Sequence, residues 1–127
     1  MAIAYQDYMP FRSARISSTV TLPSGVEQTV LTLTTDALPA GTYTFTASFT
    51  RVLNNQRDEL AWRFGGDQPS PIFTEAATRE GQDDNNGWSY SFPFEWTGGV
   101  LTETFYATAL DSSVDIEAAN MFIRRVA

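Results

Sequence analysis

Cysteine and histidine are both absent from this chain of 127 residues. Without cysteine there is no disulfide framework, no thiolate metal site and no cysteine nucleophile. Without histidine the chain lacks the commonest general base and the commonest transition-metal ligand of proteins. Most hydrolytic mechanisms are therefore excluded, and we expect a protein that is not an enzyme and that uses neither a cofactor nor a metal ion.

Lysine is absent too, so all eight basic residues are arginine. The net charge of −7 repels phosphate backbones and anionic lipid surfaces, and we expect neither nucleic acid nor a membrane as a partner. Arginine is the cation that protein interfaces favour, which indicates a protein partner. The alternative is a codon bias of the genome, and composition leaves both explanations open.

Long apolar runs are missing as well, since the longest is far shorter than the roughly 20 residues that a membrane-spanning helix needs. The first residues, MAIAYQDYMPFRSAR, combine aromatic side chains with Asp7 and two arginines, which is not the pattern of a signal peptide. We therefore expect a soluble protein that is not exported by that route. The lack of cysteine is compatible with synthesis in a reducing cytoplasm.

The chain is rich in large apolar side chains, with 43% hydrophobic and 13% aromatic residues, and its length fits one packed domain. In the stretch TYTFTASFTRV, residues 42–52, aromatic residues alternate with hydroxyl-bearing ones. A period of two is typical of a half-buried antiparallel strand. The same alternation returns at 60–64 and 88–94, and turn residues separate such segments throughout the chain. The sequence therefore predicts an all-β fold, an antiparallel β-sandwich of about eight strands without helices.

Proline and glycine supply two finer predictions. Pro23, Ser24 and Gly25 provide turn chemistry between the β-rich stretches 16–22 and 26–35, which indicates a hairpin. Pro93 lies inside the alternating stretch 88–94. Because proline donates no ladder hydrogen bond, we expect this strand to end at Pro93, to bulge there, or to lie at the edge of a sheet.

Residues 1–15 show no clean periodicity, and we expect an extended N-terminal arm ahead of a sandwich domain at 16–127. Aromatic, methionine and arginine side chains, which are typical of interface cores, are frequent in this segment. We favour docking of the arm on a neighbouring subunit; the alternative is an arm that covers an edge of its own sheet. The candidate contact residues are Tyr5, Tyr8, Met9, Phe11, Arg12 and Arg15.

Two acidic groups invite a catalytic or metal-binding interpretation. The segment DDNNG, residues 83–87, offers side-chain oxygens of the kind that bind Ca²⁺, but tight turns select the same residues. Glu95 and Glu103 flank the turn at Gly98 and Gly99 in the manner of a glycosidase carboxylate pair. Acids beside a turn more commonly form a solvated rim. We expect a loop at 81–87 and a rim at the two glutamates, with no metal site and no catalytic residue.

Three tryptophans are candidates for stacking against a sugar ring. Trp62 and Trp88 are in register with the aromatic residues of their strands, and we expect both to fill the interior. Trp96 follows Pro93, which we expect to break the register. Trp96 is therefore the predicted exposed tryptophan and the candidate residue for glycan binding.

From residue 38 to residue 126 the chain resembles the jelly-roll domains of the TNF/C1q-like kind and similar β-sandwich modules of bacteriophage virions. In these domains a strand that contains Gly-Thr-Tyr follows a turn, and the last strand carries a spaced apolar and arginine pattern. The segments that carry the resemblance are LPAGTYTFTASFT (38–50), DELAWRFGG (58–66), WSYSFPFEWTGG (88–99), VLTETFYATAL (100–110) and AANMFIRRV (118–126).

This resemblance implies a non-enzymatic structural protein of the virion, made in the cytoplasm of a bacterial host. The expected role is that of a capsid decoration (cement) protein, bound to the major capsid protein or another virion protein, with a dimer or a trimer as the expected homo-oligomer. Such sandwiches bury a face between subunits, and Tyr106, Phe122 and Arg124 are the residues that we assign to that face.

Two alternatives stay open. One is a carbohydrate- or receptor-binding module of a phage tail fibre or knob, which would use Trp96 and the loops at 65–71 and 81–87. The other is a small enzyme on a sandwich scaffold, which the lack of histidine and cysteine disfavours.

Overall fold

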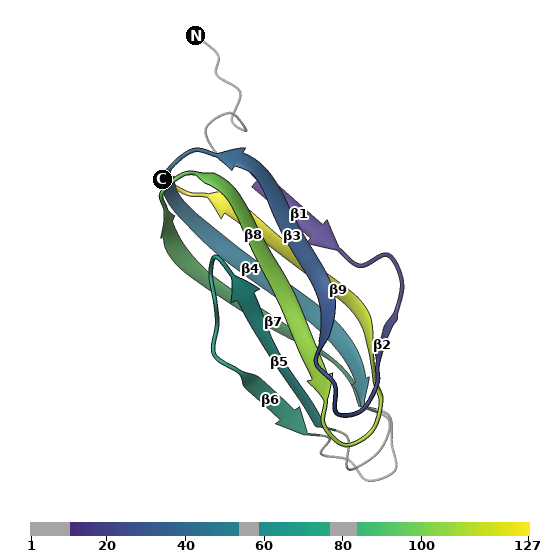
Figure 1. Cartoon of the computed structure of the whole chain (residues 1–127). Helices are drawn as coiled ribbons and strands as arrows, with labels where there is room; N and C mark the ends of the chain where they lie inside the picture. Colours follow the sequence, from purple (N-terminus) through teal and green to yellow (C-terminus); the bar gives the residue numbers. More distant parts are fainter. Residues whose placement is uncertain (1–10, 54–58, 77–83) are drawn as a thin grey trace.

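The computed structural model describes residues 11–53, 59–76 and 84–127, and in these residues the chain forms nine β-strands and no helix (Figure 1). Accordingly, no helix in the described part of the chain is long and apolar enough to cross a membrane. The strands are β1 (Phe11–Arg15), β2 (Val20–Leu22), β3 (Gln28–Leu38), β4 (Gly41–Leu53), β5 (Glu59–Gly66), β6 (Phe73–Ala76), β7 (Asp84–Trp96), β8 (Gly99–Ala109) and β9 (Val114–Arg125).

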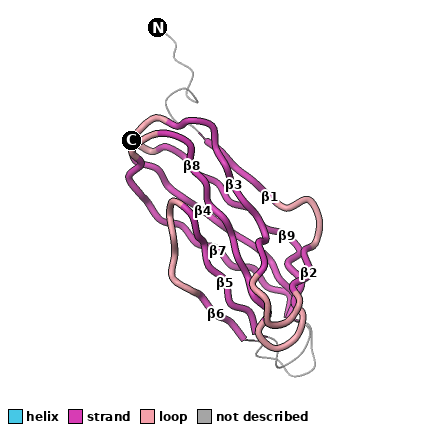
Figure 2. The backbone as a smooth tube through the Cα atoms, in the orientation of Figure 1, coloured by secondary structure: helices cyan, strands magenta, loops and turns pink. Residues whose placement is uncertain are grey.

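The strands form two sheets that pack face to face (Figures 1 and 2). The five-stranded sheet has the order β1-β9-β4-β7, with β2 also paired to β9, and the four-stranded sheet has the order β3-β8-β5-β6. Every ladder between these strands is antiparallel. The predicted all-β fold, an antiparallel β-sandwich with jelly-roll-like architecture, is confirmed, with nine described strands where about eight were expected.

The core lies between the sheets and follows the alternation that the sequence shows. In β4 the side chains of Tyr43, Phe45 and Phe49 are buried, while the threonines between them face outward. From the other sheet, Trp62 and Phe64 of β5 meet them with 3% and 0% exposure. Aromatic side chains carry large apolar areas, so their burial is the main driving force for stacking the two sheets.

The hairpin predicted between 16–22 and 26–35 is wrong. β2 pairs with β9 in one sheet, and β3 pairs with β8 in the other, so the turn at residues 23–25 crosses the sandwich. Gly25 lies in this crossing and has a φ of 80°. Its N–H donates a hydrogen bond of 2.6 Å to the Ala109 carbonyl. Turn chemistry indicates where a chain reverses, but it does not indicate which sheet the next strand joins.

The prediction for Pro93 is confirmed in one of its three forms, because β7 is the edge strand of its sheet. Pro93 pairs with Thr44 of β4, and the strand continues through it to Trp96 without a break in register. A missing N–H is tolerated at an edge, where half of the backbone donors have no strand to meet.

Residues 11–15, which we expected in the arm, form the strand β1. Each of these residues pairs with β9, from Phe11 opposite Arg124 to Arg15 opposite Asn120. The sheet therefore begins at Phe11 and not at Ile16, and this part of the segment covers an edge of its own sheet. Tyr5, Tyr8 and Met9 lie outside the described residues.

Candidate functional site

The outer face of the five-stranded sheet is lined by small hydroxyl-bearing side chains. Along β4 the outward residues from Thr42 to Thr50 are all threonine or serine, because they alternate with the buried rings. The flanking outward residues of β7 are Ser89, Ser91, Pro93 and Glu95, and those of β9 include Asn120, Phe122 and Arg124. The middle of this face therefore carries no charge, although the protein has a net charge of −7.

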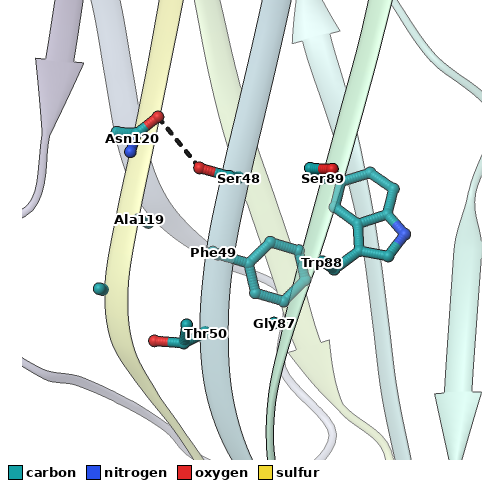
Figure 3. Close-up of a pocket in the computed structure, with 9 residues that line it drawn as sticks. Ser48, Phe49, Thr50, Gly87, Trp88, Ser89, Ala119 and Asn120 are labelled. Atoms are coloured by element: carbon teal, nitrogen blue, oxygen red, sulfur yellow. Dashed lines mark hydrogen bonds between the residues drawn. The ribbon is translucent and has the colours of Figure 1, made fainter.

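Hydrogen bonds between strands hold these side chains in place. The hydroxyls of Thr46 and Ser91 lie 3.1 Å apart, and Ser48 Oγ donates to Asn120 Oδ1 at 3.2 Å. Figure 3 shows Ser48 and Asn120 pointing toward each other from β4 and β9. Side chains that are already ordered lose little conformational freedom when a partner binds, which favours association.

A shallow hollow of about 370 Å³ opens in this face beside the Ser48–Asn120 pair (Figure 3). It exists because Gly87, Thr50 and Ala118 form a cross-strand row with little side-chain volume. A β-bulge lies next to it, since Thr50 pairs with Ala118 but Arg51 pairs with Ile116, which leaves Glu117 as an extra residue in β9. Bulges of this kind re-aim neighbouring side chains.

Asn120 is the residue that joins this hollow to two others on the same face. The second hollow is lined by residues 15–18 and 117–120, and the third by residues 13–15 together with Asn120 and Phe122. Asn120 therefore stands at the centre of a continuous, uneven and mostly uncharged surface. The sequence did not single it out, because its place depends on the register of β9 against both β1 and β4.

Three of the predicted partner-binding residues meet on this face. Phe122 and Arg124 project outward from β9, and Arg15 lies opposite Asn120 on β1. Phe122 is half-buried and both arginines are exposed. The side chain of Phe11 is not described, although its backbone pairs with Arg124.

Two other predicted residues lie elsewhere. Arg12 binds Asp36 of β3 through a two-pronged ion pair of 2.6 and 3.0 Å, which links the edges of the two sheets. This bond holds the pKa of the Asp36 carboxyl below its usual value. Tyr106 faces outward from the four-stranded sheet, with the guanidinium carbon of Arg63 4.2 Å from its ring centroid.

Trp96 is not the freely exposed ring that the sequence predicted. The register of β7 continues through Pro93, so Trp96 shares the inward face with Trp88, Tyr90, Phe92 and Phe94, and it is half-buried against the core. Its Nε1–H donates to the Gly99 carbonyl at 3.1 Å. Trp62, with 3% exposure, lies in the core as predicted.

The two glutamates that we expected on one rim belong to different sheets and to opposite environments. Glu95 is exposed and accepts a hydrogen bond of 2.6 Å from Thr42. Glu103 is wholly buried, which contradicts the predicted solvated position. Burial raises the pKa of Glu103 to about 7, partly offset by a hydrogen bond from the Gln68 N–H. The alternation of Leu101, Glu103 and Phe105 along β8 held the signal for its inward position.

The predicted loop at 81–87 is also different in the structure, because β7 begins at Asp84 and pairs with the end of β4. Asp83 lies outside the described residues, and the side chains of 84–86 are not described. Elsewhere in the described ranges, no three carboxylates approach closely enough to hold a metal ion.

Comparison with known proteins identifies the fold. No family model matches this chain, and no curated protein matches it in sequence. Among solved structures, Eiger TNF from S. frugiperda is similar over 93% of this chain and 94% of its own, with 8% identity and a TM-score of 0.58. PRD1 vertex protein P5 is similar over 92% of this chain and 96% of its own, with 12% identity and a TM-score of 0.51.

A structure of infectious bursal disease virus, Gx strain, is similar over 95% of this chain but only 38% of that chain, with 10% identity and a TM-score of 0.54. Identities this low demonstrate a common fold and nothing finer. They support the jelly-roll sandwich that the sequence resemblance implied.

Proposed function

We propose that this chain is a non-enzymatic structural protein of a virion, a decoration (cement) protein that binds a neighbouring shell protein such as the major capsid protein. The observation that carries the proposal is the outer face of the five-stranded sheet. From Thr42 to Thr50 its central strand presents uncharged hydroxyls, and those of Thr42, Thr46 and Ser48 bond across strands. Depletion of charge at the centre of a surface is what distinguishes protein interfaces.

Beside the hydroxyl row of β4, the strands β9 and β1 carry side chains that suit the anchoring of a partner. Phe122 offers apolar area, and Arg15 and Arg124 offer planar donors that suit carboxylates. Both arginines are positive groups on a protein with a net charge of −7, so the part of this face that carries them suits an acidic or neutral neighbour. The fold agrees with a place in a virion, since a PRD1 vertex protein and a structure of infectious bursal disease virus share it.

The proposed mechanism is stabilisation by mass action. A protein that binds the assembled shell and not its separated subunits shifts the equilibrium toward the shell. Each contact through one sheet face is modest, but many copies on one particle add up, and a dimer or trimer of this chain would gain further from multivalency.

The test compares two matched variants on particles prepared without this protein. Thr46→Arg places a charge at the middle of the proposed face, where Thr46 bonds to Ser91 at 3.1 Å. Thr104→Arg places the same charge at the middle of the opposite sheet, where Thr104 bonds to Thr32 at 3.2 Å. We expect wild type and Thr104→Arg to co-sediment with the particles and raise their bursting temperature, and Thr46→Arg to do neither. Equal bursting temperatures with and without the wild-type protein would reject the proposal.

A second candidate function is the binding of a neutral carbohydrate, and the hollow beside Ser48 and Asn120 is the observation that favours it. Its polar lining consists of hydroxyl and amide groups without charge, which match the hydroxyls of a sugar. A glycan array with wild type and Asn120→Ala separates the two functions. A decoration protein gives no signal on the array, whereas a carbohydrate-binding protein gives one that Asn120→Ala removes.

A further inference from the structure

Glu103 is an acidic side chain in the interior of the sandwich. It occupies an inward position of β8, with 0% exposure, between Leu33 of β3 and Gly66 of β5. What lies over it is the segment 66–72, which leaves the end of β5 and leads to β6.

This segment is fastened to β8 at Glu103 and at the residue before it. Gln68 donates its N–H to Glu103 Oε1 at 2.8 Å. Asp67 and Thr102 exchange two bonds, from Asp67 N to the Thr102 carbonyl at 3.0 Å and from Thr102 N to Asp67 Oδ2 at 2.8 Å. Gly66 lies so close that a Cβ there would be 2.9 Å from Glu103 Oε1. The segment is therefore seated directly on the carboxyl group.

The second oxygen of this carboxyl group has no such bond. Glu103 Oε2 is buried and has no hydrogen-bond partner among the described residues. A protonated carboxyl tolerates this position, but a carboxylate in an apolar interior needs water or donors on both oxygens. Burial raises the pKa of Glu103 to about 7 for this reason.

The charges near Glu103, like its burial, favour the protonated carboxyl group. Asp67, on the segment itself, further raises the pKa of Glu103 by repulsion between like charges. The register neighbours Leu33 and Gly66 carry no charge. The inward-facing arginines of the other sheet, Arg12 and Arg51, are paired with Asp36 and Glu75 and are not among the groups that shift the pKa of Glu103.

We propose that Glu103 is a pH-sensitive latch for the segment 66–72: its protonated carboxyl keeps the segment closed on β8, and its ionised carboxylate opens the segment to reach water. This inference does not depend on the proposed function. The two states differ in proton number, so pH sets their ratio. Closing binds a proton, and opening releases it.

The size of the effect follows from the two pKa values. With about 7 in the closed state and the ordinary 4.5 in the open state, the opening constant rises tenfold per pH unit between these values. It levels off above pH 7, after a total rise of roughly 300-fold. At low pH the segment stays closed.

Amide hydrogen exchange, followed by NMR from pH 5 to pH 8.5, measures this opening at the Gln68 N–H. After correction for the intrinsic rate, we expect its protection to fall tenfold per unit up to about pH 7 and then to level off. The reference is the Phe45 N–H in the centre of β4, which reports global unfolding. We expect Phe45 to stay far better protected than Gln68 at every pH.

Glu103→Gln is the matched variant, because glutamine keeps the size and the Oε1 acceptor but cannot ionise. We expect the protection of Gln68 in this variant to be independent of pH. Asp67→Asn keeps an acceptor for Thr102 and removes the like charge. In this variant the protection of Gln68 should therefore stop falling at a lower pH than in wild type. Equal protection at Gln68 and Phe45 would overturn the proposal, since the segment would then open only with the whole fold. A pH dependence retained in Glu103→Gln would overturn it as well.

Discussion

Phe45 of β4 and Phe64 of β5 meet edge to face across the sandwich, with ring centroids 5.4 Å apart and ring planes at 68°. Both side chains have 0% exposure, and they belong to different sheets. Edge-to-face contact between such rings contributes beyond the area that they bury. This pair is therefore a direct link between the two layers of the fold.

Replacement of Phe64 by alanine should lower the free energy of unfolding by about 3–5 kcal/mol, because the variant loses both buried area and ring contacts. Urea denaturation followed by tryptophan fluorescence measures the loss. The control is Thr44→Val on the outer face of β4, which should change stability by less than about 0.5 kcal/mol. A similar small loss in both variants would contradict the assigned core.

The ion pair between Arg51 and Glu75 should be important for stability. Arg51 is 1% exposed and Glu75 is 26% exposed, so Glu75→Gln removes a carboxylate from a buried guanidinium. We expect a loss of about 2–4 kcal/mol, again measured by urea denaturation. Glu27→Gln is the matched control, because its partner Arg63 is 35% exposed and water screens the pair. Equal losses in the two variants would show that burial does not strengthen the Arg51 pair.

Alanine should be tolerated at Gly25 but not at Gly66. Gly25 has a φ of 80° and open space where a Cβ would lie, so Gly25→Ala adds only backbone strain of about 1 kcal/mol. Gly66 has a φ of 124°, and a Cβ there would lie 2.5 Å from the Thr102 carbonyl oxygen. Gly66→Ala should therefore cost at least about 2 kcal/mol in thermal or urea unfolding. Equal costs at both positions would refute the close approach of β5 to β8.

The buried Glu103 should make stability fall as pH rises. Its pKa is raised to about 7 in the folded state, so its contribution is fully present below the unfolded value of 4.5 and is lost as pH rises to about 7. The difference in unfolding free energy between wild type and Glu103→Gln should change by up to about 3 kcal/mol over this window. Denaturation curves at several pH values measure it.

The exposed carboxylates Glu27 and Asp36 have the opposite effect, because they make stability rise with pH. Hydrogen bonds from Arg63 and Arg12 lower the pKa values of Glu27 and Asp36, so these pairs stabilise the fold above the ordinary carboxyl pKa and lose their effect as pH falls. Wild type and Glu103→Gln share both ion pairs. The contribution of these pairs therefore cancels in the difference between the two unfolding free energies. A difference that stays constant from pH 4 to pH 8 would show that Glu103 is not buried as an acid.

The sequence predicted the strands better than it predicted their partners. The alternation in β4 correctly indicated which side chains are buried, and Pro93 correctly indicated an edge as one of three possibilities, because both are local signals. The crossing at residues 23–25 was missed, since the pairing of β2 with β9 joins residues that are far apart in the chain. Pairing of this kind depends on the packing of the whole core.

The candidate site was predicted only in part, for a related reason. The hydroxyl row of β4 was visible in the sequence, and Phe122, Arg124 and Arg15 were named, but nothing local placed them on one face. Asn120 was missed because the bulge at Glu117 shifts the phase of β9, so that Ala119 and not Ala118 turns inward. A shift of one residue in a strand exchanges its two faces.

The position of β9 affects the order in which the protein can be built on the ribosome. β9 is the last of the nine strands to be translated, and β1, β2 and β4 all pair with it. The five-stranded sheet therefore cannot be completed before β9 has been translated, and the strands made earlier must wait for it. Folding should be slow for a chain of this size, and the waiting strands would be a suitable substrate for chaperones.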